Sequence, residues 1–194
     1  SIKRVIDDLF MDDTVDLIEE MPSNVVKRIL KNIDKSNRTV INELLKFPED
    51  SAGSIMTTET VELKKDMTVD EVISFLKIKA ETDKVELYYV YVIDKSGHLL
   101  GVLSLRSLFT TPPYVKVEDI MIGDLVRVNV DDDQEVAAET LSKYGILAVP
   151  VVDHYGKLKG IVTWDDAQDV VEEETTDEIL QSSGISTDII EEEI

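Results

Sequence analysis

Apolar residues in the first fifty positions recur three and four apart, the spacing that places side chains on one face of a helix. The clearest stripe is formed by Val25, Val26, Ile29, Leu30 and Ile33. Ser23 is expected to cap this helix, because a serine hydroxyl accepts a hydrogen bond from a free backbone N–H of the first turn. Shorter stripes lie on either side, and Pro48 ends the last one. The pattern predicts three or four short helices that pack against one another, since each is marginal alone.

Beyond about residue 54 the pattern changes to alternating strands and helices, and one motif occurs twice. Residues 91–104 read YVIDKSGHLLGVLS and residues 151–163 read VVDHYGKLKGIVT. Each copy predicts a β-hairpin: an apolar strand, a turn closed by aspartate and glycine, and a second strand. Glycine inside the second strand indicates a bulge or a close approach of another backbone. The repeated positions are Asp94, Gly97 and Gly101, which recur as Asp153, Gly156 and Gly160.

Helices are expected before and after each hairpin. Thr68 and Asp133 stand where the N-caps of the preceding helices belong, and an amphipathic helix should follow each second strand. Two such half-buried units should pack together about a pseudo-two-fold axis. The predicted fold class is therefore α+β: a short N-terminal helical segment, two β-α repeats packed as a pair, and an acidic helix at the end.

Composition excludes several classes of protein. The net charge of −21 disfavours binding to nucleic acid and to anionic membrane surfaces. The chain has no cysteine, which excludes disulfides and cysteine catalysis and fits a reducing compartment. No apolar run approaches the roughly 20 residues of a membrane span. We expect no insertion of this segment into a membrane and, because no charged-then-apolar leader opens the chain, no secretion.

The negative charge is concentrated at the end of the chain. Residues 165–194 contain twelve aspartates and glutamates and no lysine or arginine. Asp166, Asp169 and Glu173 fall on one helical face, where like charges repel. Mg²⁺ is a natural counter-ion, because it prefers oxygen ligands and can bridge one or two carboxylates while keeping several waters. A solvated charged face is the commoner explanation of such a run.

The repeated motifs carry a resemblance to known families. The Ile-Met pairs at 55–56 and 120–121, together with the two hairpin motifs, resemble a tandem pair of cystathionine β-synthase (CBS) repeats over about residues 54–172. A narrower resemblance, to the MgtE family of magnesium transporters, covers the whole chain. It is carried by residues 49–57 (EDSAGSIMT), 88–92 (YYVYV), 101–106 (GVLSLR) and 162–167 (VTWDDA).

This resemblance implies a division of the chain and a function. Residues 1–52 would be a fragment of a helical N domain, 53–114 and 115–172 the two CBS repeats, and 173–194 the start of a connecting plug helix. Such proteins are homodimers whose cytosolic domains bind Mg²⁺ and close a membrane pore. The pore, and the first part of the N domain, would lie outside this sequence. The chain would then be a regulatory domain at the cytoplasmic face of the cell membrane.

The resemblance also implies metal ligands. Asp12 and Asp16, four residues apart in the N-terminal segment, would face Glu135, Asp166 and Asp169 of the CBS pair, and Mg²⁺ would hold the two acidic surfaces together. Asp177 and Glu178 match acidic positions at the start of the plug helix. An isolated surface aspartate is more often a solvated charge or a helix cap than a ligand, so each assignment is an expectation.

An alternative function is adenine-nucleotide sensing for another effector, because CBS pairs often bind such nucleotides, ATP among them. In the second repeat Thr163 and Asp166 match the ribose-binding positions, whereas Ser107 replaces the carboxylate in the first. The predicted nucleotide contacts are Ser104, Arg106, Val149, Pro150, Thr163 and Asp166. An enzyme is not expected, because the sequence has no nucleophile elbow, P-loop or histidine-rich metal cluster.

Overall fold

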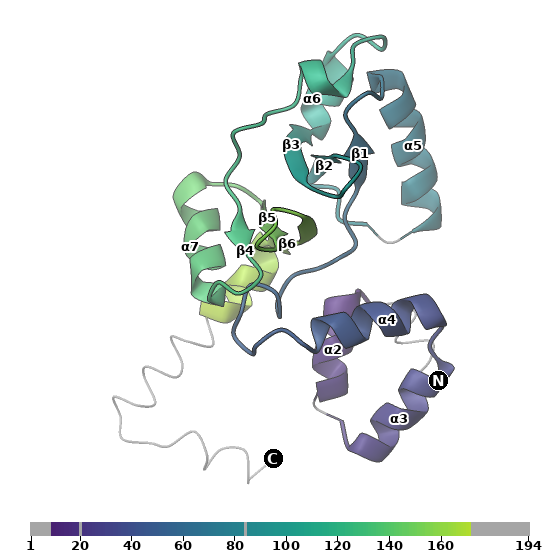
Figure 1. Ribbon diagram of the computed structural model, residues 1–194, viewed down its shortest axis with the longest axis vertical. Helices are drawn as coiled ribbons and strands as arrows, with labels where there is room; N and C mark the ends of the chain where they lie inside the picture. Colours follow the sequence, from purple (N-terminus) through teal and green to yellow (C-terminus); the bar gives the residue numbers. More distant parts are fainter. Residues whose placement is uncertain (1–8, 20, 84, 172–194) are drawn as a thin grey trace.

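The computed structural model describes residues 9–19, 21–83 and 85–171 (Figure 1). The N-terminal segment forms three helices: α2 (Met11–Glu19), α3 (Ser23–Asn32) and α4 (Lys35–Leu44). Their buried faces meet through Val15, Ile18, Ile29, Ile41 and Leu44. The predicted cap at Ser23 is wrong. Pro22 is the N-cap residue of α3, because its carbonyl accepts from the backbone N–H groups of Val25 and Val26.

Two repeats of the same plan follow. The first contains β1 (Glu62–Lys64), α5 (Val69–Thr82), β2 (Tyr89–Ile93), β3 (Leu99–Ser104), α6 (Leu105–Thr110) and the short 3₁₀ turn η1 (Val117–Asp119). The second contains β4 (Val128–Asn129), α7 (Gln134–Tyr144), β5 (Ala148–Val152) and β6 (Leu158–Thr163), and then residues 164–171 continue as a helix. The structure confirms the α+β fold class.

Each repeat folds around a mixed three-stranded sheet. The predicted hairpins are present as β2–β3 and β5–β6, and their turns place Gly97 and Gly156 at φ values of +89° and +81°. The pattern did not predict the short parallel strands β1 and β4, which pair with β2 and β5. The expected caps are confirmed, since the side chains of Thr68 and Asp133 accept from the backbone N–H groups of Glu71 and Glu135.

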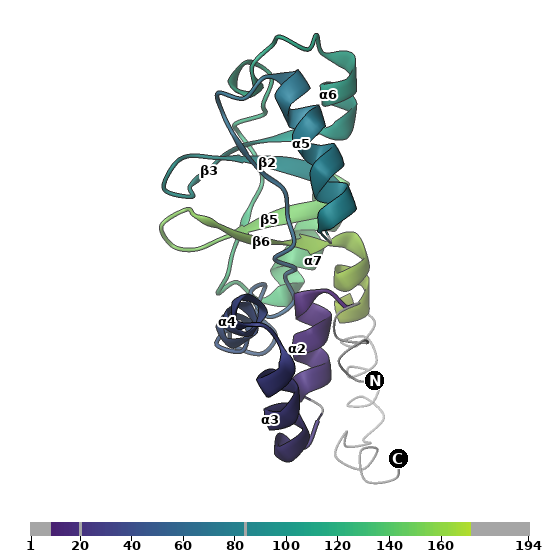
Figure 2. The same ribbon diagram turned by 90° about the vertical axis from the view of Figure 1, so that its right-hand side faces the viewer.

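The two repeats are joined by reciprocal backbone hydrogen bonds. Thr57, which precedes β1, exchanges two 2.9 Å backbone hydrogen bonds with Ile161 in β6. Val102 in β3 exchanges two with Ile122 before β4, at 3.0 and 2.9 Å. Both exchanges pass next to a strand glycine: a Cβ at Gly160 would collide with the carbonyl oxygen of Thr57, and one at Gly101 would come within 2.9 Å of that of Ile122. The two sheets therefore form one unit, seen edge-on in Figure 2.

The helical segment packs on the second repeat. One apolar cluster includes Val15 and Ile41 of the N-terminal helices together with Leu141 of α7 and Ala167 of the following helix. The segment that connects α4 to the first repeat also contacts the second repeat, because the backbone N–H groups of Ala52 and Gly53 donate to the carbonyls of Asp132 and Val130. Among the described residues, no helix is long and apolar enough to cross a membrane. The N-terminal helices are thus held against the second repeat.

Candidate functional site

The first turn of α2 meets the segment that leads into β1. The backbone N–H of Met11 donates to Oε1 of Glu59 over 2.9 Å. The other carboxylate oxygen of Glu59 accepts from the hydroxyls of Thr57, at 3.0 Å, and Thr58, at 3.3 Å. Glu59 therefore joins the N-terminal helices to the CBS repeats through hydrogen bonds on both of its oxygens.

Asp12 is buried at this contact without a full set of partners. Its side chain is 7% exposed, and within the described part of the chain its Oδ1 atom has no hydrogen-bond partner. Burial first, and then the nearby carboxylates of Asp166, Asp13 and Glu59, raise the pKa of Asp12 to about 8. A buried carboxylate oxygen without a partner is costly, so this position calls for a proton or a cation.

Asp166 approaches Asp12 from the helix that follows β6. Thr163 donates its hydroxyl proton to Oδ2 of Asp166 over 2.5 Å. Burial raises the pKa of Asp166 above its ordinary value; the Thr163 hydrogen bond opposes this shift, and the neighbouring aspartates Asp165, Asp13 and Asp169 add to it. The same turn that ends the sheet therefore aims a second partly buried carboxylate at α2.

Two further side chains extend the cluster. Burial raises the pKa of Glu86, and Asp165, Asp166 and Glu59 raise it further. Tyr88 has a raised pKa for the same reasons, burial first and then Asp165 and Glu86. We call this cluster the acidic junction: Asp12, Asp13, Glu59, Glu86, Asp165 and Asp166. The ion pairs between described residues use Lys65, Lys79, His98 and Lys116, so none of them supplies the junction with a cation.

The donor set of the acidic junction fits Mg²⁺, which binds carboxylate oxygens and retains water ligands. Among the described residues, no three acidic or histidine side chains converge closely enough to hold a metal ion by themselves. Bridging by one carboxylate from each of two elements needs no such convergence. Asp12 on α2 and Asp166 on the helix after β6 are such a pair.

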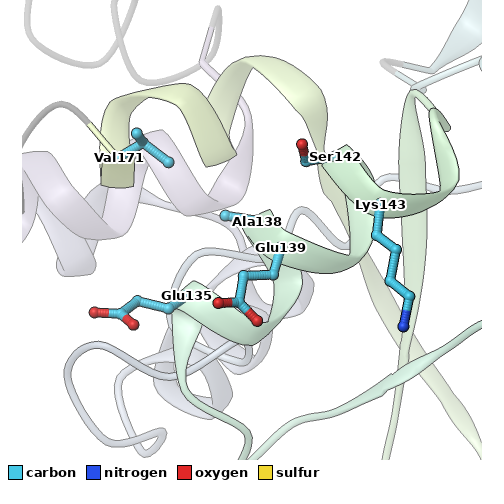
Figure 3. Close-up of a pocket in the computed structure, with 6 residues that line it drawn as sticks. All are labelled: Glu135, Ala138, Glu139, Ser142, Lys143 and Val171. Carbon is cyan, nitrogen blue, oxygen red and sulfur yellow. The ribbon is translucent and has the colours of Figure 1, made fainter.

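The other predicted ligands lie at varying distances from this pair. Asp169 is exposed one turn beyond Asp166, and Asp16 is exposed one turn beyond Asp12 on α2. Glu135 lies on α7, in a groove of about 510 Å³ between that helix and Val171 (Figure 3). There the carboxylates of Glu135 and Glu139 lie toward one end, while Lys143 extends away from them. Asp177 and Glu178 lie outside the described residues.

Sequence reasoning missed four members of the junction: Asp13, Glu59, Glu86 and Asp165. Asp13 directly follows Asp12, and its contribution depends on how α2 docks. Glu59 and Glu86 come from irregular segments, where no periodicity places a side chain on a face. A detectable signal was the run Thr57-Thr58-Glu59, in which two hydroxyls precede a carboxylate that they can hold.

A second concave site lies between the two sheets. This tyrosine pocket has a volume of about 270 Å³ and is almost wholly apolar. It is lined by Tyr89, Tyr91, Val102, Ile122, Leu125, Val126, Tyr144, Ile146, Ala148 and Pro150. The hydroxyl of Tyr91 is buried and has no hydrogen-bond partner among the described residues, and burial raises its pKa. The Tyr89 hydroxyl accepts from the backbone N–H of Leu147 at 3.4 Å.

The predicted nucleotide contacts are divided between the two sites. Pro150 lines the tyrosine pocket, and Ser104 ends β3, whose residue Val102 lines the same pocket. Arg106 is exposed at the start of α6, and Val149 is fully buried in the apolar cluster. Thr163 and Asp166 belong to the acidic junction.

Comparison with known proteins identifies the parts of the chain. Residues 1–50 match the MgtE intracellular N domain, and residues 52–112 and 117–173 match the CBS domain. The magnesium transporter MgtE of Thermus thermophilus is 40% identical over 172 residues, which are 87% of this chain and 38% of that protein. MgtE of Bacillus subtilis is 35% identical and covers 92% of this chain and 39% of its own length. The chain thus spans about two fifths of these relatives.

A solved structure shows the same arrangement. The crystal structure of the cytosolic domain of the Mg²⁺ channel MgtE in complex with ATP superposes with a TM-score of 0.82 at 38% identity. The match covers 87% of this chain and 68% of that one. The helical segment, the CBS pair and their relative order are all included. This chain belongs to the MgtE family, in which it corresponds to the non-enzymatic, regulatory cytosolic region: the intracellular N domain followed by the CBS pair.

Proposed function

We propose that this chain senses Mg²⁺ and regulates ion passage through a membrane domain of the same polypeptide, working as a homodimer. The observation that carries the proposal is the unpaired Oδ1 of Asp12, which is buried opposite Asp166 with no cation nearby among the described residues. The relatives named as magnesium transporters and the matching channel domain agree with this role.

The proposed mechanism uses the acidic junction as a bridge. Without metal, Asp13 on α2 and Asp166 on the helix after β6 repel one another, while Asp12 retains a proton because its pKa is about 8. Asp12 and Asp166 would hold Mg²⁺, which would supply positive charge in place of that proton and keep α2 against the CBS repeats. A ligand shifts an equilibrium only through its preference for one state, and a bridging site exists only in the closed state.

Glu59 has a different part in this mechanism. Its two oxygens are engaged by Met11, Thr57 and Thr58, so it positions the first turn of α2 without metal. Asp12 is therefore presented to Asp166 before the ion arrives. Glu135, which was predicted to face α2, and Asp177 and Glu178 in the sequence of the predicted plug helix would bind further ions and link the clamp to that helix.

Trp164 provides a direct test, because it is the single tryptophan of the chain and immediately precedes Asp165 and Asp166. We expect Mg²⁺ to change its fluorescence with a half-maximal concentration that rises at least tenfold in Asp12→Asn and in Asp166→Asn. Asp124→Asn, an exposed carboxylate between the repeats, is the matched control and should leave the titration unchanged. An equal response to NaCl at matched ionic strength, or unchanged titrations in both junction variants, would reject the proposal.

The tyrosine pocket supports a second role, binding of an adenine nucleotide such as ATP. Its apolar walls and three tyrosines suit a planar base, and the buried Tyr91 hydroxyl is available for a hydrogen bond. Ala148→Phe should fill the pocket and abolish ATP binding measured by calorimetry, while the Mg²⁺ response of Trp164 persists. If the variant binds ATP as the parent does, the nucleotide does not occupy this pocket.

A further inference from the structure

One region of the chain has the opposite charge to the rest. Residues 21–47 carry six lysines and arginines against two acidic residues, a net charge of +4, whereas the remaining chain carries −25. Lys27, Lys31 and Lys35 follow one another at intervals of four residues, and all three are exposed. Lys27 and Lys31 share one side of α3, and Lys35 begins α4 at the corner between the helices. We call these three residues the lysine row.

The lysine row has no partner in the described part of the chain. The ion pairs found there involve none of its members, and the apolar side of α3 faces inward through Ile29. Exposed lysines are ordinarily interspersed with acidic residues. Here the exposed acids of the N-terminal helices lie mainly on α2, as Asp13, Asp16 and Glu19.

The complementary charge lies in the sequence just beyond the described residues. Residues 172–194 contain nine aspartates and glutamates and no lysine or arginine. The chain enters this segment from Val171, at the end of the helix whose Ala167 packs in the same apolar cluster as Val15 of α2. Val171 itself lies beside α7 (Figure 3), so the tethered segment starts on the second repeat, and Glu174 and Glu178 repeat the four-residue spacing of the lysines.

We infer that the lysine row is the docking surface for the acidic segment 172–194 of the same chain. Tethering makes the association intramolecular, so several weak ion pairs suffice where a separate partner would need more. Twenty-three residues reach about 35 Å even when helical, whereas α3 is about 15 Å long. Anionic lipid and nucleic acid are poorer occupants, because the net charge of −21 repels both.

This docking forms without Mg²⁺, in the state in which the proposed ion sites at Asp177 and Glu178 are empty, and it complements the metal bridge at Asp12 and Asp166. The acidic junction holds the base of α2, whereas the lysine row would hold the acidic segment at the other side of the N-terminal helices. A rearrangement of α3 would then be transmitted to the segment that leads out of the CBS pair. The contact should weaken as salt rises, since exposed charges are screened over about 10 Å at 0.1 M ionic strength.

Disulfide trapping tests the inference, because the chain contains no native cysteine. The full chain carrying Lys31→Cys and Glu174→Cys is oxidised in the presence of chelator. We expect an intramolecular disulfide to form at least fivefold faster than in the control pair Lys77→Cys and Glu174→Cys, whose first site is an exposed lysine of α5. Raising NaCl from 50 to 500 mM should remove most of that advantage.

Charge variants provide the second readout. Adding Lys27→Glu and Lys35→Glu should slow trapping to the control rate, whereas Lys27→Arg and Lys35→Arg should preserve it. Equal rates for the two cysteine pairs overturn the inference, and so do disulfide-linked dimers as the main product, which would assign the surface to a second copy. Because trapping is measured without Mg²⁺, its failure leaves the proposed metal sensor untouched, and failure of the Trp164 titration leaves the docking untouched.

Discussion

The two repeats share a backbone plan, yet equivalent positions in them have opposite chemistry. After β6, Thr163 and Asp166 form a short hydrogen bond in a cluster of carboxylates. After β3, the equivalent Ser104 and Ser107 form a longer hydrogen bond of 3.3 Å between two neutral hydroxyls and cap α6, and the neighbouring pocket is lined by tyrosines. An aspartate in one repeat and a serine in the other thus accompany an acidic site and an apolar site. Two repeats with the same fold can therefore differ in the ligand that each would bind.

The largest expected effect concerns the backbone that the repeats share. Gly160→Ala should destabilise the chain by more than about 3 kcal/mol, because the new Cβ meets the Thr57 carbonyl oxygen. Gly101→Ala should cost about 1–3 kcal/mol, since part of its clash is with the flexible Met121 side chain. Urea unfolding measures both, with Gly123→Ala as a control whose nearest neighbour is 3.6 Å away. Equal losses would show that the two exchanges are energetically equivalent.

The next largest effect is a pH dependence of the free energy of unfolding that arises at Asp12 in the acidic junction. Asp12 has a pKa near 8 in the folded chain, above the ordinary value of 3.8. The folded state therefore holds a proton that the unfolded state has released, and stability falls as pH rises from about 4 to 8. Without metal, the parent should lose roughly 2 kcal/mol more than Asp12→Asn between pH 5.5 and 8.5 in urea unfolding. Parallel pH profiles would mean that Asp12 does not carry this dependence.

Exchanging the side chains that differ should convert one site toward the other. Ser107→Asp restores a carboxylate beside the tyrosine pocket and should tighten ATP binding about tenfold, or about 1.4 kcal/mol, in calorimetry. It should not alter the Mg²⁺ titration of Trp164, which reports the acidic junction. Ser107→Asn, which adds bulk without charge, is the matched control. A gain in Mg²⁺ response rather than ATP binding would contradict the division between the sites.

The smallest effect tests the tyrosine pocket alone. Tyr91→Phe removes a buried hydroxyl that has no partner among the described residues, so the ligand-free chain should gain up to about 1 kcal/mol in the free energy of unfolding. The same variant should weaken ATP binding, because the ligand loses its hydrogen bond. Tyr89→Phe is the comparison, since its hydroxyl accepts from Leu147. A loss of stability in Tyr91→Phe would show that the hydroxyl is already satisfied.

Local features of the fold could be predicted from the sequence because they depend on neighbouring residues. Thr68 and Asp133 cap their helices through the next few residues, and both hairpins follow from their aspartate and glycine. The failed cap at Ser23 is also local, since the preceding Pro22 carbonyl already starts the helix. The parallel strands β1 and β4 were missed because two or three residues show no usable alternation.

The site depended more on tertiary structure. The meeting of Asp12 with Asp166 was expected from the family resemblance, and no spacing in the sequence brings together residues 154 positions apart. Glu59 and Glu86 escaped notice because irregular segments give a side chain no predictable direction. That Asp12 is buried and Asp16 exposed follows from how α2 docks, since the two residues lie four positions apart on the same side of the helix.

The reciprocal backbone hydrogen bonds at Thr57–Ile161 and Val102–Ile122 also suggest an order in which parts of the chain fold. Ile122 reaches Val102 by closing a loop of about twenty residues, whereas Thr57 must find Ile161 across more than one hundred. Longer closures cost more entropy and slow folding when they form early. We expect the Val102–Ile122 exchange to form first and the Thr57–Ile161 exchange last. During synthesis the N-terminal helices would then pack on the second repeat only after that repeat has been completed.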